Sequence, residues 1–340
     1  MNTTNRPSGS LPLSILDLVP VVSGHSISES FHNSLDLAQS AEKLGYNRYW
    51  LAEHHNMAGI ASSATSVLIG YIAGGTSSIR VGSGGIMLPN HSPLVVAEQF
   101  GTLASLYPGR IDLGLGRAPG TDQFTAMALR RHLGSVEDFP RNLQELRQYL
   151  SEDNRVGKVR AVQAEGQDIP VWLLGSSTYS AQLASMLGLP FAFASHFAPN
   201  LLFASLKIYR ENFEPSAELE TPYVMAGVNV VAADTDEEAE YLATSLYQSF
   251  LNVIRGTALP VQPPTHDMES KWNASEKYAV QQMLTYTFIG SPATLETKLR
   301  AFVKQTGVDE LMVGTSVFDH QARLRSFEIL SGLNIEKRRS

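Results

Sequence analysis

Two adjacent histidines stand directly after an apolar run of the sequence. The run 46–52 (YNRYWLA) ends in Glu53-His54-His55. Imidazole titrates near neutral pH, so a histidine at a strand end is suited to acid–base chemistry. Successive strand residues point to opposite faces, so the two rings do not easily reach one metal ion, and their spacing is not that of a zinc-protease helix. We therefore expect one of the two rings to face a site, and we expect no bound metal.

A second set of residues is suited to an anion. Arg117 follows the run 111–116, and a guanidinium binds phosphate through two parallel hydrogen bonds. The segment Gly175-Ser176-Ser177-Thr178 opens a predicted helix, whose free N–H groups and dipole favour negative charge. Ordinary capping explains only one of its three hydroxyls. Together these residues predict a phosphate-bearing ligand, with a structural ion pair as the alternative for Arg117.

Glycines crowd the apolar run 80–88 (RVGSGGIML), at Gly82, Gly84 and Gly85. Glycine weakens a strand interior and marks a bend or the close approach of a ligand. A flat ring lying against bare backbone explains the Gly84-Gly85 pair, and a tight bend at a barrel corner explains it equally well. Both interpretations stay open on the sequence.

These residues need a frame that brings the ends of separate strands together. Short apolar runs alternate with capped helical patterns along the whole chain, which predicts alternating strands and helices. Eight strands, each followed by a helix, favour one α/β domain over 1–340, a (β/α)8 TIM barrel whose site lies at the C-terminal strand ends. The predicted strands cover residues 13–19, 46–52, 80–88, 111–116, 171–174, 191–195, 223–232 and 311–315.

Helix boundaries are marked by recognisable end signals. Ser26 with Glu29 three residues later is a capping box, and Gly45 stands where a left-handed residue ends a helix. Ser92 before Pro93 predicts another helix start, and Gly307 predicts a helix end.

An irregular segment lies between the seventh and eighth predicted strands. Residues 256–275 carry Pro260, Pro263 and Pro264. An insertion at this point would overhang the C-terminal face of a barrel, which makes it a candidate lid. A passive surface excursion is the alternative.

Composition narrows the classes of function. The 340 residues are 43% hydrophobic and 17% charged, which is enough apolar material for a core. A net charge of −7 argues against nucleic acid or an anionic membrane surface as partner. The absence of cysteine excludes disulfides, thiolate metal sites and a cysteine nucleophile.

The first residues and the hydropathy pattern bear on location. Residues 1–12 are polar and have no apolar run behind them, so we expect a flexible segment and no secretory signal. No stretch approaches 18 consecutive apolar residues, so we expect no membrane span and a cytoplasmic protein.

Three segments resemble the luciferase-like monooxygenase family, flavin-dependent (β/α)8 enzymes related to bacterial luciferase. They are LGYNRYWLAEHHNM (44–57), IRVGSGGIMLPNHSPLVVAEQ (79–99) and LYPGRIDLGLGRAPGTD (106–122), and GSP at 290–292 is similar to the family's C-terminal part. The similarity covers nearly the whole barrel and is greatest to the group-one oxidoreductases of the family.

The resemblance assigns roles to several positions. His54 corresponds to the histidine that luciferases use when reduced flavin reacts with oxygen, which makes it the expected catalytic residue. Gly84 and Gly85 correspond to a pair joined by a non-prolyl cis peptide beneath the flavin ring. Arg117 and Ser176 correspond to ligands of the FMN phosphate. The expected cofactor-binding residues are Glu53, Gly84, Gly85, Arg117, Gly175, Ser176 and Ser177.

Two positions depart from luciferase. Its reactive cysteine corresponds to Gly116 here, and an acidic residue of its phosphate loop corresponds to Gly175. The first difference argues against aldehyde-linked light emission. Neither difference argues against flavin binding.

The expected function is that of an FMN-dependent monooxygenase acting on paired donors with incorporation of molecular oxygen. Because the chain carries no nicotinamide fingerprint, a separate NAD(P)H:flavin reductase is expected to supply the reduced FMN. The family implies a homodimer. Aldehyde, sulfonate and heterocyclic substrates all stay open.

Three other functions stay open or are disfavoured on the sequence. Hydride transfer with a deazaflavin fits the same phosphate site. A flavin-binding protein without turnover fits the same fold. A metal-dependent hydrolase would rest on His54 and His55 alone, and strand alternation argues against it.

Overall fold

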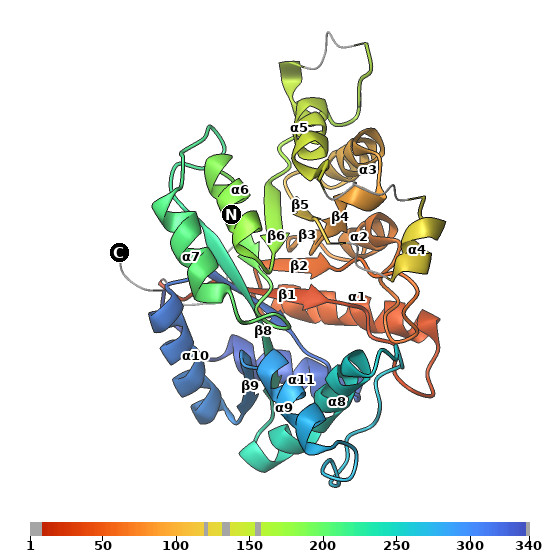
Figure 1. The fold of residues 1–340 in the computed structure, drawn as a ribbon, viewed down its shortest axis with the longest axis vertical. Helices are drawn as coiled ribbons and strands as arrows, with labels where there is room; N and C mark the ends of the chain where they lie inside the picture. The colour runs from red at the N-terminus through yellow and green to blue at the C-terminus, as the bar shows by residue number, and fades with distance from the viewer. Residues whose placement is uncertain (1–8, 119–121, 131–136, 154–157, 338–340) are drawn as a thin grey trace.

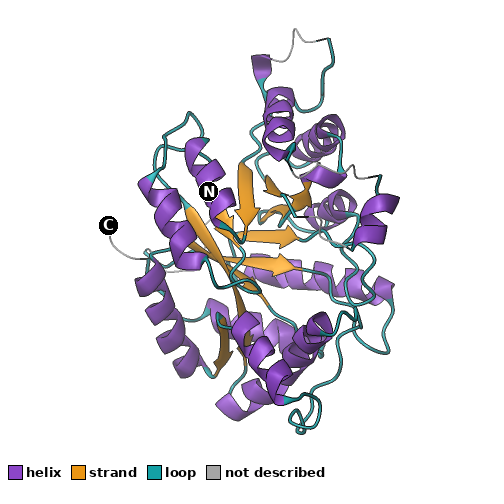
Figure 2. Cartoon of the chain, in the orientation of Figure 1, coloured by secondary structure: helices purple, strands orange, loops and turns teal. Residues whose placement is uncertain are grey.

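A closed barrel of parallel strands lies at the centre of the computed structural model, which describes residues 9–118, 122–130, 137–153 and 158–337. Eight of the strands in these residues pair in the cyclic order β1-β2-β3-β5-β6-β7-β8-β10, and β8 pairs with β10 to close the ring. Helices surround the strands (Figure 2). The predicted (β/α)8 barrel is confirmed. The strands are β1 Leu13–Asp17, β2 Arg48–Leu51, β3 Arg80–Ser83, β4 Ile86–Met87, β5 Ile111–Gly116, β6 Val171–Gly175, β7 Phe191–Phe193, β8 Val224–Ala232, β9 Thr287–Gly290 and β10 Glu310–Gly314.

The helices follow the strands in the order expected of this architecture (Figure 1). Ser26 forms the predicted capping box with Glu29, and Gly307 ends its helix in the left-handed region at φ 61°. They are α1 Ile27–Lys43, α2 Thr65–Gly74, η1 Leu88–Asn90, α3 Pro93–Leu106, α4 Gln123–Ala128, α5 Phe139–Leu150, α6 Thr178–Met186, α7 Leu202–Glu211, α8 Asp236–Ile254, α9 Ala274–Met283, α10 Pro292–Thr306 and α11 His320–Ser331. None of these described helices combines the length and the apolar character needed to cross a membrane.

Two features of the sheet differ from the prediction. The run 80–88 is not one strand, because it breaks at Gly84-Gly85 between β3 and β4. The second feature is β9, which pairs with the last residues of β8, beyond the part of β8 that pairs with β7. Figure 1 shows β9 beside α8 and α9, which form an addition at one side of the barrel. This addition has its own small apolar core, which includes Val231, Leu246 and Val280.

Successive side chains along each strand point alternately into two apolar layers. Ile15, Tyr49 and Leu51 belong to the large core between barrel and helices. Their neighbours Leu16 and Trp50 belong to a second cluster inside the barrel, as the two-residue period of a strand requires. The other members of the inner cluster include Ala52, Trp172, Ala192, Met225 and Met312.

A network of charged side chains fills the barrel at the N-terminal ends of its strands, and we call it the charged plug. Arg48 begins β2 and donates to Asp112 (2.7 Å) and to Glu310 (3.2 Å). Tyr223 donates to Glu310 at 2.8 Å, and Arg80 donates to Asp112 at 2.6 Å. Glu310 and Asp112 are fully buried. A plugged N-terminal end leaves the C-terminal end, called the mouth below, as the place for a ligand.

Some predicted segments fall partly outside the described residues. Residues 1–8 of the expected flexible segment and Pro119 and Gly120 of the loop after β5 are among them. In the remainder of the first segment, Leu11 is buried, and its backbone N–H donates to the Ile335 carbonyl at 2.7 Å.

Candidate functional site

His54 lies at the mouth, directly after β2. It continues the alternation of Arg48, Trp50 and Ala52, whose side chains face the barrel interior. Its Nδ1 is buried and has no hydrogen-bond partner among the described residues. Such an atom costs about 1–3 kcal/mol unless a ligand or water meets it. Burial lowers the pKa of His54, against the opposing charge of Glu53, so the ring is neutral at pH 7.

Glu53 and His55 face away from this position. The Glu53 carboxylate is buried and accepts hydrogen bonds from the Met87 backbone N–H (2.8 Å) and from Asn90 (3.1 Å). It also contacts the Nε2 atoms of His55 (2.9 Å) and His91 (3.0 Å). Burial raises the pKa of Glu53, but these contacts outweigh it and leave the pKa below its usual value. Glu53 therefore braces the segment after β4 against β2, and its part in cofactor binding stays a prediction.

The peptide bond between Gly84 and Gly85 is cis. A Cβ on Gly84 would lie 2.7 Å from Leu16 Cδ1, and a Cβ on Gly85 would lie 2.7 Å from the Gly114 carbonyl oxygen. Packing inside the barrel thus excludes a side chain at both positions, and the dipeptide offers only backbone to a ligand. Gly116 is also tightly packed, because a Cβ there would lie 2.8 Å from Met87 Sδ.

Arg117 and the start of α6 come together through an aromatic ring. The Arg117 guanidinium carbon lies 4.0 Å from the ring centre of Tyr179, in the first turn of α6. This contact places a cation beside Ser176 and Ser177, which precede the helix. The Ser177 hydroxyl makes no capping hydrogen bond. An arginine beside a helix N-terminus whose serine hydroxyl is not used for capping is suited to bind a phosphate.

Gly175 has a packing reason of its own. A Cβ at this position would lie 2.2 Å from the hydroxyl oxygen of Ser180 in α6. The glycine thus lets the first turn of α6 approach the end of β6, which carries Ser176 and Ser177 to the mouth.

Sequence reasoning missed His196, which follows β7 as His54 follows β2. Its Nδ1 is also buried without a hydrogen-bond partner among the described residues. Burial, with a smaller effect of His54, lowers the pKa of His196 to about 4. The criterion that singled out His54, a titratable residue at a strand end, would have found His196 as well.

Part of the predicted lid region is held to the barrel by backbone hydrogen bonds. We call this part, residues 259–263, the strap. Val261 donates to the Val21 carbonyl (2.8 Å) and accepts from Ser23 N–H (2.9 Å). Gly59 approaches the strap closely, because a Cβ there would lie 2.3 Å from the Leu259 carbonyl oxygen. The strap therefore lies against the loops that follow β1 and β2. Movement of 256–275 as a lid stays a prediction.

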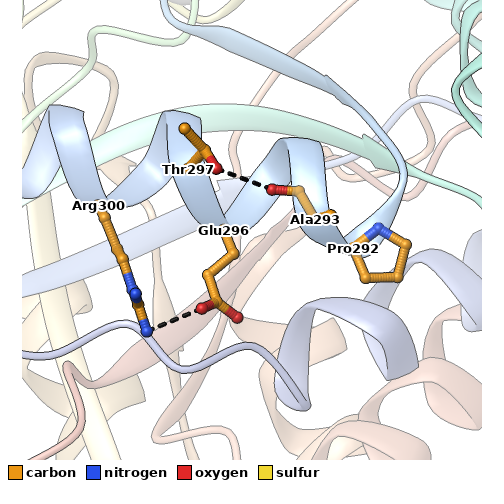
Figure 3. Close-up of a pocket in the computed structure, with 5 residues that line it drawn as sticks. All are labelled: Pro292, Ala293, Glu296, Thr297 and Arg300. Carbon is orange, nitrogen blue, oxygen red and sulfur yellow. Dashed lines mark hydrogen bonds and ion pairs between the residues drawn. The ribbon is translucent and has the colours of Figure 1, made fainter.

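Two other features of the described residues bear on the choice of site. No group of three or more His, Asp or Glu residues in this part of the chain is arranged to hold a metal ion. A hollow of about 620 Å³ lies on the outer side of α10, lined by Pro292, Ala293, Glu296, Thr297 and Arg300 (Figure 3). Its charged residues, Glu296 and Arg300, pair with each other at 2.7 Å, so the mouth is the better candidate site.

Residues 13–310 match the family model described as luciferase-like monooxygenase. The chain belongs to the luciferase-like monooxygenase family. Similar proteins of this family include uncharacterized protein YvbT of Bacillus subtilis (59% identical, 94% of this chain and 95% of the relative). A luciferase-like monooxygenase of Escherichia coli is 57% identical over 94% of this chain and 96% of its own length. The N-acetyl-S-alkylcysteine monooxygenase of B. subtilis is 32% identical over 94% and 97%.

Solved structures agree with this membership. Apo-MsnO8 has a TM-score of 0.87 and 36% identity, covering 94% of this chain and 97% of its own. The oxygenating constituent of 3,6-diketocamphane monooxygenase from Pseudomonas putida, in complex with FMN, has a TM-score of 0.75 at 17% identity, covering 96% and 98%. An F420-dependent secondary alcohol dehydrogenase has a TM-score of 0.69 at 14% identity, covering 94% and 97%. The last two similarities show the fold alone.

Proposed function

We propose that this luciferase-like monooxygenase uses reduced FMN and O2 to oxygenate a small organic substrate. The observation that carries the proposal is the arrangement of Arg117 beside Ser176, Ser177 and the start of α6. Its cation, hydroxyls and N–H groups are the donors that a flavin phosphate requires. The bare backbone of Gly84-Gly85 and the unpartnered Nδ1 of His54 lie at the same mouth.

The residues at the mouth have separate roles in the proposed reaction. Bound reduced FMN would supply two electrons and two protons, so that substrate and O2 would give an oxygenated product and one water. Arg117 and the α6 start bind the phosphate, and Gly84-Gly85 leaves room for a flat ring. His54, neutral at pH 7, accepts or donates one proton at Nδ1, a role worth about 10²–10⁴-fold in rate.

The partners complete this proposal. An NAD(P)H:flavin reductase supplies reduced FMN, and the protein acts as a homodimer in the cytoplasm. Because one relative is named an N-acetyl-S-alkylcysteine monooxygenase, N-acetyl-S-alkylcysteines are the first substrates to assay.

The test follows oxygen uptake by the purified protein with FMN, NADH and a flavin reductase. We expect tight FMN binding, uptake that a substrate stimulates, and a loss of about 10²-fold or more in His54→Ala. The matched control is His32→Gln, which changes an exposed histidine of α1. A His54→Ala variant with unchanged turnover would refute the role of His54.

A deazaflavin-dependent hydride transfer is the second candidate, since its coenzyme also carries a phosphate that the Arg117 site would bind. Equilibrium binding of FMN and of the deazaflavin, measured side by side, separates the two. Tight FMN binding without oxygen consumption on any reductant would instead favour a flavin-binding protein without turnover.

A further inference from the structure

The His196 ring points into the barrel. A Cβ on Gly227 would lie 2.4 Å from His196 Nδ1 and 3.2 Å from its Cε1. Gly227 continues the alternation of Tyr223 and Met225, whose side chains face the interior. The imidazole therefore occupies the space of the side chain that Gly227 lacks.

The position of His196 is fixed from two further sides. Asn229, the next inward position of β8, donates its side-chain N–H to the His196 carbonyl at 2.6 Å. The Phe197 ring packs edge-on against the imidazole, with 4.9 Å between the ring centres. Neither contact engages Nδ1, so this atom is held in place without being satisfied.

His54 and His196 stand on opposite walls of the mouth. In the cyclic strand order, three strands separate β2 from β7 in either direction. A charge on His54 nonetheless opposes protonation of His196 across the mouth. The other charged or titratable groups that act on His54 are Glu53 and His55, from its own strand end. Each ring thus has one buried, unpartnered Nδ1 at the same mouth.

We propose that His196 is a second proton-carrying residue of the reaction site, on the wall of the mouth opposite His54. The catalytic part of this inference rests on the proposed function. When oxygen is transferred to a substrate, the other oxygen atom leaves as water and must receive protons. Without substrate, reduced FMN and O2 give FMN and hydrogen peroxide, and that reaction also needs proton transfer.

The first test measures the pair in the protein without flavin. Histidine labelled with ¹³C at Cε1 is titrated by NMR, and the His196 signal is assigned by its loss in His196→Gln. We expect the His196 midpoint below pH 5 in the wild type, and a higher midpoint in His54→Gln, because the opposing charge is gone. His32→Gln serves as the control and leaves the midpoint unchanged. An unchanged titration midpoint of His196 in His54→Gln would overturn the placement of both rings at one reaction site.

The second test measures hydrogen peroxide formation when the protein with reduced FMN is mixed with O2. We expect His196→Ala to slow the reaction by about 10²-fold and added imidazole to restore it. Gly227→Ala displaces the ring and also slows the reaction, but imidazole does not restore it, because the new methyl group fills the space. Full activity of His196→Ala, or slow activity that imidazole does not restore, contradicts a proton-carrying role.

The two tests separate the two proposals. A wild-type protein that does not bind reduced FMN refutes the proposed function, whereas the NMR titration still decides whether the two histidines lie close enough at one mouth to affect each other's protonation.

Discussion

Replacing Arg117 with alanine should weaken FMN binding without weakening riboflavin binding. The guanidinium lies 4.0 Å from the centre of the Tyr179 ring, beside the α6 start. There it would contact the phosphate, which riboflavin lacks. A hydrogen bond to a charged group contributes about 1.5–3 kcal/mol, so the dissociation constant for FMN should rise about 10- to 150-fold. Arg117→Lys should recover only part of the affinity, because an ammonium lacks the planar pair of donors.

The measurement is a fluorescence titration of each variant with FMN and with riboflavin. The matched control is Arg141→Ala, which removes a largely exposed arginine of α5 and should change neither affinity. The deciding quantity is the ratio of the two affinities, since a misfolded mouth weakens both ligands equally. Equal losses for FMN and riboflavin in Arg117→Ala would refute the assignment of the phosphate to this residue.

Three further predictions concern stability and the strap. Glu310→Gln leaves a buried cation of the charged plug poorly paired, which should lower the free energy of unfolding by about 3–5 kcal/mol. Calorimetry should then show a Tm lower by about 4–7 °C. The control Glu296→Gln, in the partly exposed ion pair on α10, should change Tm little. Because the pKa of His196 is lowered to about 4, the unfolded chain binds its proton near pH 6.5 and the folded chain does not. The unfolding free energy from urea titration should therefore fall between pH 6.5 and 4, and less so in His196→Gln; equal slopes would contradict this. Gly59→Ala should push the strap away from its neighbours and speed limited proteolysis within 256–273, whereas Gly70→Ala, with its nearest contact at 3.4 Å, should not.

Local signals predicted most of the barrel because they are encoded by neighbouring residues. The capping box of Ser26 and the left-handed Gly307 define helix ends within one turn. The eight barrel strands were found because each is a short apolar run between such signals. Their ends still differ by a few residues, as β1 does by stopping at Asp17 rather than at residue 19.

The features that were missed depend on contacts between distant segments. β9 is a four-residue run that pairs with the end of β8, and nothing in its own residues marks that partner. The run 80–88 appears continuous in hydropathy, but in the structure β3 ends at Ser83 and a separate β4 begins at Ile86. His196 gains its orientation from the missing side chain of Gly227 on the next strand. Such relationships appear only once the barrel is closed.

The charged plug and the mouth stand at opposite ends of the same strands. A five-residue strand such as β1 spans about 16 Å, which exceeds the distance of about 7–10 Å beyond which substitutions without shared partners act independently. The effects of a mouth variant and a plug variant on the free energy of unfolding should therefore add. For protein engineering, this separation means that substrate specificity and thermal stability can be changed independently. The loops that follow the strands can be varied to bind new substrates, while the charged plug at the other end keeps Tm unchanged.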